Sequence, residues 1–219
     1  MQRPLAPRTG YSPAERRLDA TVHVIGVGAV LLAVPLLIGA AVMRTIGVES
    51  GNFVVAVSIY GATFLAMIGA SACYNLGLRP GWDWLLQRLD HSAIYLKIAG
   101  TYTPFTLIPG QGLGLLAGLW GAAACGVALK LISPVRFRTL ALALYLGMGW
   151  VGVLILPTLA QSLPFATLVL MFAGGLTYTT GVLFYLWKQL PYHFVIWHVF
   201  VLVASFLFYA AVMVLLFAQ

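Results

Sequence analysis

The sequence has few charged residues and few cysteines. Asp, Glu, Lys and Arg make up 8% of its 219 residues, whereas a soluble domain carries about a quarter. So few charges could not cover a water-facing surface, which excludes a cytosolic enzyme, a disordered tail and a secreted disulfide scaffold. The two cysteines, Cys73 and Cys125, both lie in apolar stretches, and we expect them to be buried free thiols rather than a disulfide.

Apolar residues fill the chain instead, at 62% of the total with a mean hydropathy of +0.98. A helix that crosses the hydrocarbon core needs about 20 mostly apolar residues. The sequence predicts seven such helices, over residues 20–43, 52–76, 90–108, 113–132, 137–156, 164–187 and 193–217. The expected fold is therefore all-α, a polytopic membrane bundle of seven transmembrane helices over residues 20–219, preceded by an N-terminal segment over residues 1–19.

The basic residues are distributed unequally between the two ends of these helices. Arg44 alone falls on one side. The other side carries ten, namely Arg3, Arg8, Arg16, Arg17, Arg79, Arg88, Lys130, Arg136, Arg138 and Lys188. By the positive-inside rule, the N-terminus is expected in the cytoplasm and the C-terminus outside. The formal charge of +7 includes no long basic run, so no nucleic-acid partner is expected.

Polar side chains within the predicted spans fall near one depth. Such groups are costly inside a bilayer unless they are paired or face a cavity. They lie at the cytoplasmic ends of four helices, and they are His23, Ser71, Asn75, Asp90, His91, His193 and His198. This common depth predicts a polar pocket that opens to the cytoplasm.

Several of these residues also have simpler interpretations. Asp90 could cap the N-terminus of its helix, and His91 and His193 could lie at the headgroup level. His23 and Ser71 could serve only as hydrogen-bond partners between helices. Lys97 lies about 10 Å deeper than Asp90 on the same helix face, where it either extends to the interface or pairs with Asp90 or another acceptor in the pocket.

Four blocks of sequence carry a family resemblance. They are Leu89-Asp90-His91-Ser92-Ala93-Ile94-Tyr95, continued by Ile98-Ala99-Gly100-Thr101-Tyr102-Thr103-Pro104-Phe105, then Met148-Gly149-Trp150, then Gly174-Gly175 with Tyr178 and Gly181, and finally Ile196-Trp197-His198. From about Glu15 to its C-terminus, the chain resembles the haemolysin-III-like branch of the progestin and adipoQ receptor family. This resemblance implies a seven-helix bundle with an intracellular N-terminus, which agrees with the charge distribution. Together with the compact length of the chain, it implies a plasma membrane location, in the inner membrane of a bacterium.

The resemblance also implies a zinc ion near the cytoplasmic face, bound by three histidines. The family site is similar to that of alkaline ceramidases, which implies a zinc-activated water that attacks a lipid amide or ester. Asp90 and Ser71 match the family's catalytic carboxylate and serine. The sequence departs from the family at two of the three ligand positions, which hold Asn75 and Phe194, and only His198 matches.

A shifted histidine does not restore the expected ligand set. His193 lies five residues before His198, and two positions five apart diverge by about 140° around a regular helix. These two side chains therefore cannot point to a common centre from a regular helix, and only a distorted first turn after Pro191 would bring His193 to it. The expected cofactor is none, or zinc at a degenerate site.

Three functions follow from these observations. The first is a protein without metal that binds membrane lipid and affects the lipid state of the membrane. The second is a zinc-dependent intramembrane hydrolase of lipid amides or esters, against which the lost ligands argue. The third is a pore-forming, haemolysin-like protein, although no span shows a polar stripe along its length. Membrane lipid is the expected partner.

Overall fold

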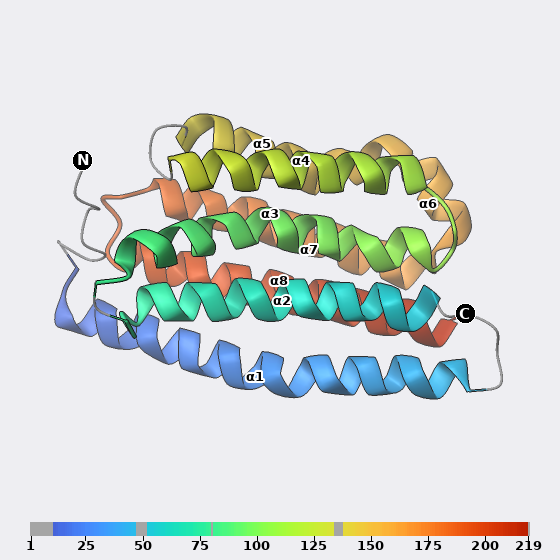
Figure 1. The fold of residues 1–219 in the computed structure, drawn as a ribbon, viewed down its shortest axis with the longest axis horizontal. Helices are drawn as coiled ribbons and strands as arrows, with labels where there is room; N and C mark the ends of the chain where they lie inside the picture. The colour runs from blue at the N-terminus through green and yellow to red at the C-terminus, as the bar shows by residue number, and fades with distance from the viewer. Residues whose placement is uncertain (1–10, 47–51, 80, 134–137, 219) are drawn as a thin grey trace.

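The computed structural model describes residues 11–46, 52–79, 81–133 and 138–218, which form helices joined by short turns. In chain order the helices are α1 (Pro13–Thr45), α2 (Asn52–Asn75), α3 (Asp83–Leu107), α4 (Leu113–Ile132), α5 (Arg138–Trp150), a 3-10 helix (Val151–Ile155), α6 (Leu156–Ser162), α7 (Phe165–Leu186) and α8 (His193–Ala218). Figure 1 shows the long helices side by side along the long axis of the molecule. Residues 1–10 of the predicted N-terminal segment lie outside the described residues.

Among the described residues, six segments are long and apolar enough to cross a membrane, and the fifth predicted span is one of them, over residues 139–162. The helix that does not meet this criterion is α3. It packs against α2, α4, α5 and α8, so its neighbours shield its polar side chains from lipid. Six of the seven predicted spans are confirmed by length and composition, and the crossing by α3 remains a prediction.

The fifth span differs from the prediction because its helix is interrupted. A 3-10 helix over Val151–Ile155 separates α5 from α6. The Tyr102 hydroxyl on α3 lies at this break, where it donates to the Gly149 carbonyl at 2.7 Å and accepts from the Gly152 backbone N–H at 3.1 Å. Backbone groups that leave the α-helical pattern inside a membrane need such partners. This contact from α3 therefore stabilises a break in the fifth span that the hydrophobic pattern of that span does not predict.

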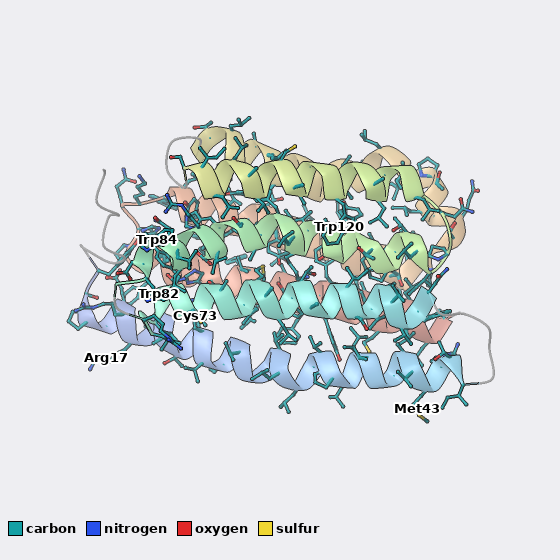
Figure 2. All side chains as sticks on the ribbon, in the orientation of Figure 1. Arg17, Met43, Cys73, Trp82, Trp84 and Trp120 are labelled. Carbon is teal, nitrogen blue, oxygen red and sulfur yellow. The ribbon has the colours of Figure 1, made fainter. Side chains whose placement is uncertain are left out.

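The helix ends divide into two groups in Figure 1. The starts of α1, α3, α5 and α8 lie at the end where α2, α4 and α7 finish, which is the end that the charge pattern assigns to the cytoplasm. Figure 2 shows Arg17 at this end of α1 and Met43 at the other, with Trp82 and Trp84 near Arg17. Tryptophan and arginine at one end are typical of a membrane interface.

Close helix contacts and outward apolar side chains complete the bundle. A Cβ at Gly100 would lie 2.1 Å from Thr63 Oγ1, so only glycine allows this approach of α2 to α3. Leu32, Leu36 and Phe165 are exposed, as expected for residues that face acyl chains. Both cysteines are free, as predicted, but Cys125 is exposed on α4; the expectation that it is buried is wrong because an apolar residue in a membrane bundle can face lipid.

Candidate functional site

A cavity of about 840 Å³ extends from the predicted cytoplasmic end of the bundle toward its middle. Six of the predicted site residues line it, namely His23, Ser71, Asp90, His91, Lys97 and His198. Phe194 also lines the cavity, whereas Asn75 and His193 are not among the described residues that do so. Most of the polar groups that the sequence places at one depth therefore share one cavity.

The most compact polar group in this region joins the first and last helices. His198 Nδ1 on α8 donates a hydrogen bond to Asp19 Oδ1 on α1 at 2.5 Å. The rings of His23 and His198 are perpendicular, with centroids 4.4 Å apart. Ligand atoms of Asp19, His23 and His198 all lie within 4.8 Å of one another. We call these three residues the α1–α8 cluster.

The sequence of α1 explains why two of these residues face α8. Asp19 and His23 are one turn apart, and the buried positions continue along the same face at Gly26 and Val30. Residues spaced three and four apart share one helix face. A Cβ at Gly26 would lie 3.3 Å from the side chain of Leu202 on α8. The apolar part of this face packs against α8, and that packing brings Asp19 and His23 to His198.

The hydrogen bonds of His23 define its protonation. Its Nδ1 lies 2.8 Å from the backbone carbonyl of Asp19, and a carbonyl only accepts, so Nδ1 carries the proton. In the neutral ring, the lone pair is therefore on Nε2. This nitrogen lies 3.2 Å from the hydroxyl of Ser71 on α2. Both ring nitrogens are therefore hydrogen-bonded, which fixes the direction of the Nε2 lone pair.

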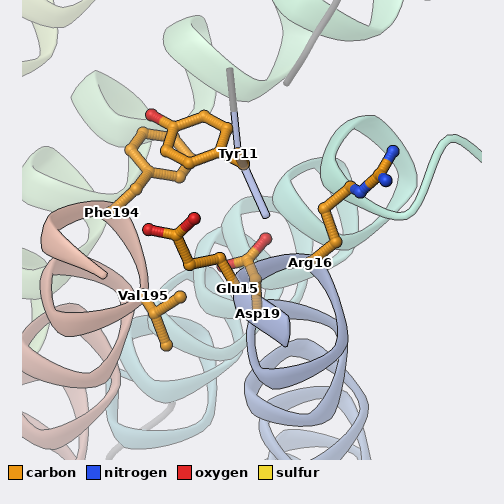
Figure 3. A pocket seen from close by; sticks show the side chains of 6 residues that line it. All are labelled: Tyr11, Glu15, Arg16, Asp19, Phe194 and Val195. Atoms are coloured by element: carbon orange, nitrogen blue, oxygen red, sulfur yellow. The ribbon is translucent and has the colours of Figure 1, made fainter. Parts of the chain in front are cut away.

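A second set of contacts fixes the start of α1 against the start of α8 (Figure 3). Ser12 and Glu15 form a capping box at the N-terminus of α1. The Glu15 carboxylate also accepts a hydrogen bond from the backbone N–H of Tyr192 at 2.8 Å. Tyr192 has a φ of 60°, which is unfavourable for a residue other than glycine. Glu15 therefore stabilises a strained turn that leads into α8.

Tyr11 covers this junction. Its hydroxyl lies 3.3 Å from His193 Nε2, and its ring packs 5.9 Å from that of Phe194. Burial raises the pKa of Tyr11, and the nearby Glu15 and Asp19 carboxylates raise it further, so the hydroxyl stays protonated. His193 thus contacts the N-terminal segment rather than the cavity.

The zinc positions implied by the family resemblance do not fit a metal in this chain. Phe194 offers no ligand atom, and its ring packs against that of His198 with centroids 4.5 Å apart. The Asn75 side-chain amide donates to the carbonyl and to the hydroxyl of Ser71, at 3.0 and 3.2 Å, within its own helix. Of the three positions, only His198 presents a good zinc donor.

Asp90 and Lys97 on α3 contact different residues. Asp90 Oδ2 is 3.3 Å from His91 Nδ1. The Lys97 ammonium donates to Thr101 Oγ1 at 2.8 Å, and it lies 4.3 and 4.7 Å from the ring centroids of Tyr60 and Phe64. Among the described residues, the ion pairs do not include one between Lys97 and Asp90. Thr101 also lines the cavity, so the second of the predicted partners for Lys97, another acceptor in the pocket, is the one observed.

Asp19 is the residue that the sequence analysis did not include in the site. The predicted first span begins at Ala20, so Asp19 falls in the segment before it. The observed helix α1 begins earlier, at Pro13. The signal was present nevertheless. A carboxylate and an imidazole four residues apart on one helix present two polar side chains to the same neighbouring helix.

Comparison with known proteins gives a consistent result. The family described as haemolysin-III related matches residues 13–209. The chain is 37% identical to the Hemolysin-3 homolog of Bacillus subtilis (strain 168) over 198 residues, which cover 89% of this chain and 91% of that protein. It is 37% identical to Hemolysin-3 of Bacillus cereus over 202 residues, 91% and 90% of the two chains. It is 26% identical to the monocyte to macrophage differentiation factor of Homo sapiens over 195 residues, 83% and 78%. No solved structure matches the chain.

Proposed function

The chain belongs to the haemolysin-III-related family, and we propose that it is a lipid-binding member that holds one acyl chain in the cavity between its helices. The cavity carries this proposal. Its volume of about 840 Å³ lies in the range of about 300–1,000 Å³ of sites that enclose whole small ligands. Apolar residues such as Ile68, Ile94 and Leu202 line it together with the polar groups. Such a wall suits a ligand with an apolar tail and a polar head.

The charges in the cavity wall favour an anionic head. Three lysines line the cavity, Lys97, Lys130 and Lys188, and Asp90 is the carboxylate among the described lining residues. Lys130 and Lys188 lie at the predicted cytoplasmic end, where a head group would face water. Opposite charges attract more strongly at a site partly shielded from water than in bulk solvent. The ligand class is therefore a single-chain lipid with a negatively charged head.

The protein is a multi-pass membrane protein, and its bacterial relatives fit a location in the inner membrane. The proposal includes seven crossings, with α3 as the central one, and a cytoplasmic N-terminus. The unequal distribution of basic residues supports this orientation. A C-terminal fusion to alkaline phosphatase should be active in cells and a C-terminal fusion to green fluorescent protein should be dark. The opposite pair of results would contradict the orientation.

Lipid binding can be tested with a cavity-filling variant. Gly149 lines the cavity, and a Cβ at this position would meet no atom within 4 Å. We expect Gly149→Leu to reduce binding of pyrene-labelled dodecanoic acid by at least tenfold, since the added side chain occupies the space of the acyl chain. Energy transfer to pyrene from Trp150 and Trp197, which line the cavity, reports binding to the purified protein.

The matched control is Gly121→Leu on α4, where a Cβ also meets no atom within 4 Å and the residue faces outward. This variant should bind the probe like the unchanged protein. The uncharged methyl ester of the probe should bind more weakly than the acid. Equal binding by both leucine variants, or no saturable binding, would contradict the proposal.

Hydrolysis of a lipid amide or ester is the second candidate function. Three histidines, His23, His91 and His198, line the cavity with Ser71 and Asp90, and these are the residue types of an acid–base or metal-assisted hydrolytic site. Release of fluorescent fatty acid from labelled ceramide by the purified protein would support this function. The Asp90→Asn variant should then lose the activity, and activity equal to that of the unchanged protein would remove Asp90 from the catalytic role.

A further inference from the structure

We propose that Asp19, His23 and His198 form a binding site for a divalent transition metal, with zinc as the preferred ion. The three residues come from α1 and α8, and only His198 belongs to the ligand set that the family resemblance implies. Asp19 and His23 would replace the ligands lost at Asn75 and Phe194. The site is thus a different one, built between the first and last helices.

The donor set selects the class of metal. Two imidazoles and one carboxylate are typical of catalytic zinc sites with three protein ligands. Calcium and magnesium prefer sites made of oxygen atoms, so the two histidines disfavour them. Among the first-row metals, nitrogen-rich sites of this kind also accept cobalt and nickel. Cobalt(II) therefore serves as a coloured substitute for zinc in a test of the site.

The geometry is close to that of a bound ion. The three ligand atoms lie within 4.8 Å of one another, and ligand atoms around a tetrahedral zinc with bonds of about 2.0 Å lie about 3.3 Å apart. Metal binding would replace the hydrogen bond between His198 Nδ1 and Asp19 Oδ1 with bonds from both residues to the ion. The Asp19 carbonyl already orients His23, which is the support that metal-binding histidines receive in known sites.

The surroundings of the cluster also suit a metal. Asp19 and His23 are 4% and 6% exposed, and an ionisable group buried in a membrane bundle is costly without a function or partner. His23 and His198 line the cavity, and so does Ser71, the hydroxyl partner of His23. The fourth coordination position of the ion would therefore face the cavity and remain available to water or to a head group. This inference does not depend on the proposed lipid binding.

Metal analysis of the full-length protein tests the site. Protein purified from cells grown with zinc, without a histidine tag, should contain about one zinc per chain by mass spectrometry. After removal of zinc with a chelator, cobalt(II) should restore one ion per chain and give the visible absorption of a tetrahedral complex. Calcium should not compete at a hundredfold excess. Less than about a tenth of an ion per chain, after both treatments, would overturn the proposal.

Variants locate the ion. His23→Gln and His198→Gln should each reduce the zinc content at least tenfold, and Asp19→Asn should weaken zinc binding. The controls are His193→Gln, which removes a histidine outside the cavity, and Asn75→Ala, which changes a ligand position of the family. Both controls should keep one zinc per chain. Loss of zinc in either control with retention in His23→Gln would overturn the assignment.

The melting temperature of the unchanged protein also distinguishes a metal site from a set of hydrogen bonds that only holds the two helices together. Zinc at a concentration well above its dissociation constant should raise the melting temperature of the chelator-treated protein, because the ion binds the folded state. This rise should vanish in His198→Gln. A melting temperature that does not respond to zinc in the unchanged protein would show that the cluster only holds α1 against α8.

Discussion

Two buried polar sites in this bundle are stabilised in different ways. The α1–α8 cluster contains a carboxylate and two imidazoles: His198 Nδ1 donates to the Asp19 carboxylate, and His23 Nδ1 donates to the Asp19 backbone carbonyl. The Lys97 ammonium, deeper in the bundle, lies over the faces of two aromatic rings and donates to one hydroxyl. An aromatic face carries partial negative charge and attracts a cation without a full opposite charge. The bundle therefore stabilises one site by hydrogen bonds to Asp19 and the other by aromatic packing.

This difference determines how each site should respond to mutation. Removal of the Asp19 carboxylate leaves the His198 N–H without its acceptor, and a buried donor without a partner is destabilising. Replacement of a lone buried cation by an apolar side chain of similar size removes its desolvation penalty together with its attractions. Stability should therefore depend much more on Asp19 than on Lys97.

The largest effect is expected for Asp19→Ala. This change removes the acceptor of the His198 hydrogen bond, and the two imidazoles then face each other at a ring separation of 4.4 Å. We expect a loss of about 2–3 kcal/mol in the free energy of unfolding, because a buried donor is left without its acceptor. Thermal unfolding in detergent, followed by circular dichroism, measures it. Asp19→Asn keeps the shape of the side chain and an acceptor oxygen and should lose clearly less; equal losses in both variants would assign the effect to the negative charge rather than to the acceptor and its packing.

A smaller effect is expected for Lys97→Met. The methionine side chain fills a similar volume beside Tyr60 and Phe64 and makes favourable contacts with aromatic rings. The lost cation–π attraction of about 2 kcal/mol is largely offset because no charge remains to be desolvated. The expected loss is about 1 kcal/mol or less, by the same thermal measurement. A loss as large as that of Asp19→Ala would show that Lys97 neutralises an anion in the cavity.

The smallest effect is expected for Asn75→Ala. Asn75 is buried, but its side-chain hydrogen bonds stay within one turn of α2. Side-chain hydrogen bonds in membrane proteins contribute about 0.6 kcal/mol on average, and we expect a loss of that order. Serine at the same position is the conservative control. A large loss would mean that Asn75 contributes to the α1–α8 cluster through Ser71.

Much of the fold could be predicted because hydrophobic length has a simple physical cause. The predicted ranges 52–76, 113–132, 164–187 and 193–217 agree with α2, α4, α7 and α8 within a residue or two. The family match confirms the resemblance found in the sequence. The predicted span begins at Asp90, whereas the observed helix α3 begins at Asp83. The part of a helix that extends out of the apolar region carries no hydrophobic signal.

The features that could not be predicted depend on contacts between distant segments. The break in the fifth span depends on the Tyr102 hydroxyl, which comes from α3. The α1–α8 cluster depends on the first and last helices being neighbours, which no local pattern indicates. Transfer from the family places the site at Asn75, Phe194 and His198, whereas two of the three residues of the α1–α8 cluster come from α1, which residue-by-residue matching to those positions does not reach.

The contact between α1 and α8 has a consequence for biogenesis. At about 5–20 residues per second, the ribosome completes His198 roughly ten seconds or more after Asp19. During that interval, the first helix is in the bilayer while its acid and imidazole still lack the last helix. A truncated copy that ends before α8 would keep the Asp19 carboxylate without its His198 partner, which only the finished chain supplies. The junction of the two chain ends therefore distinguishes complete molecules from incomplete ones.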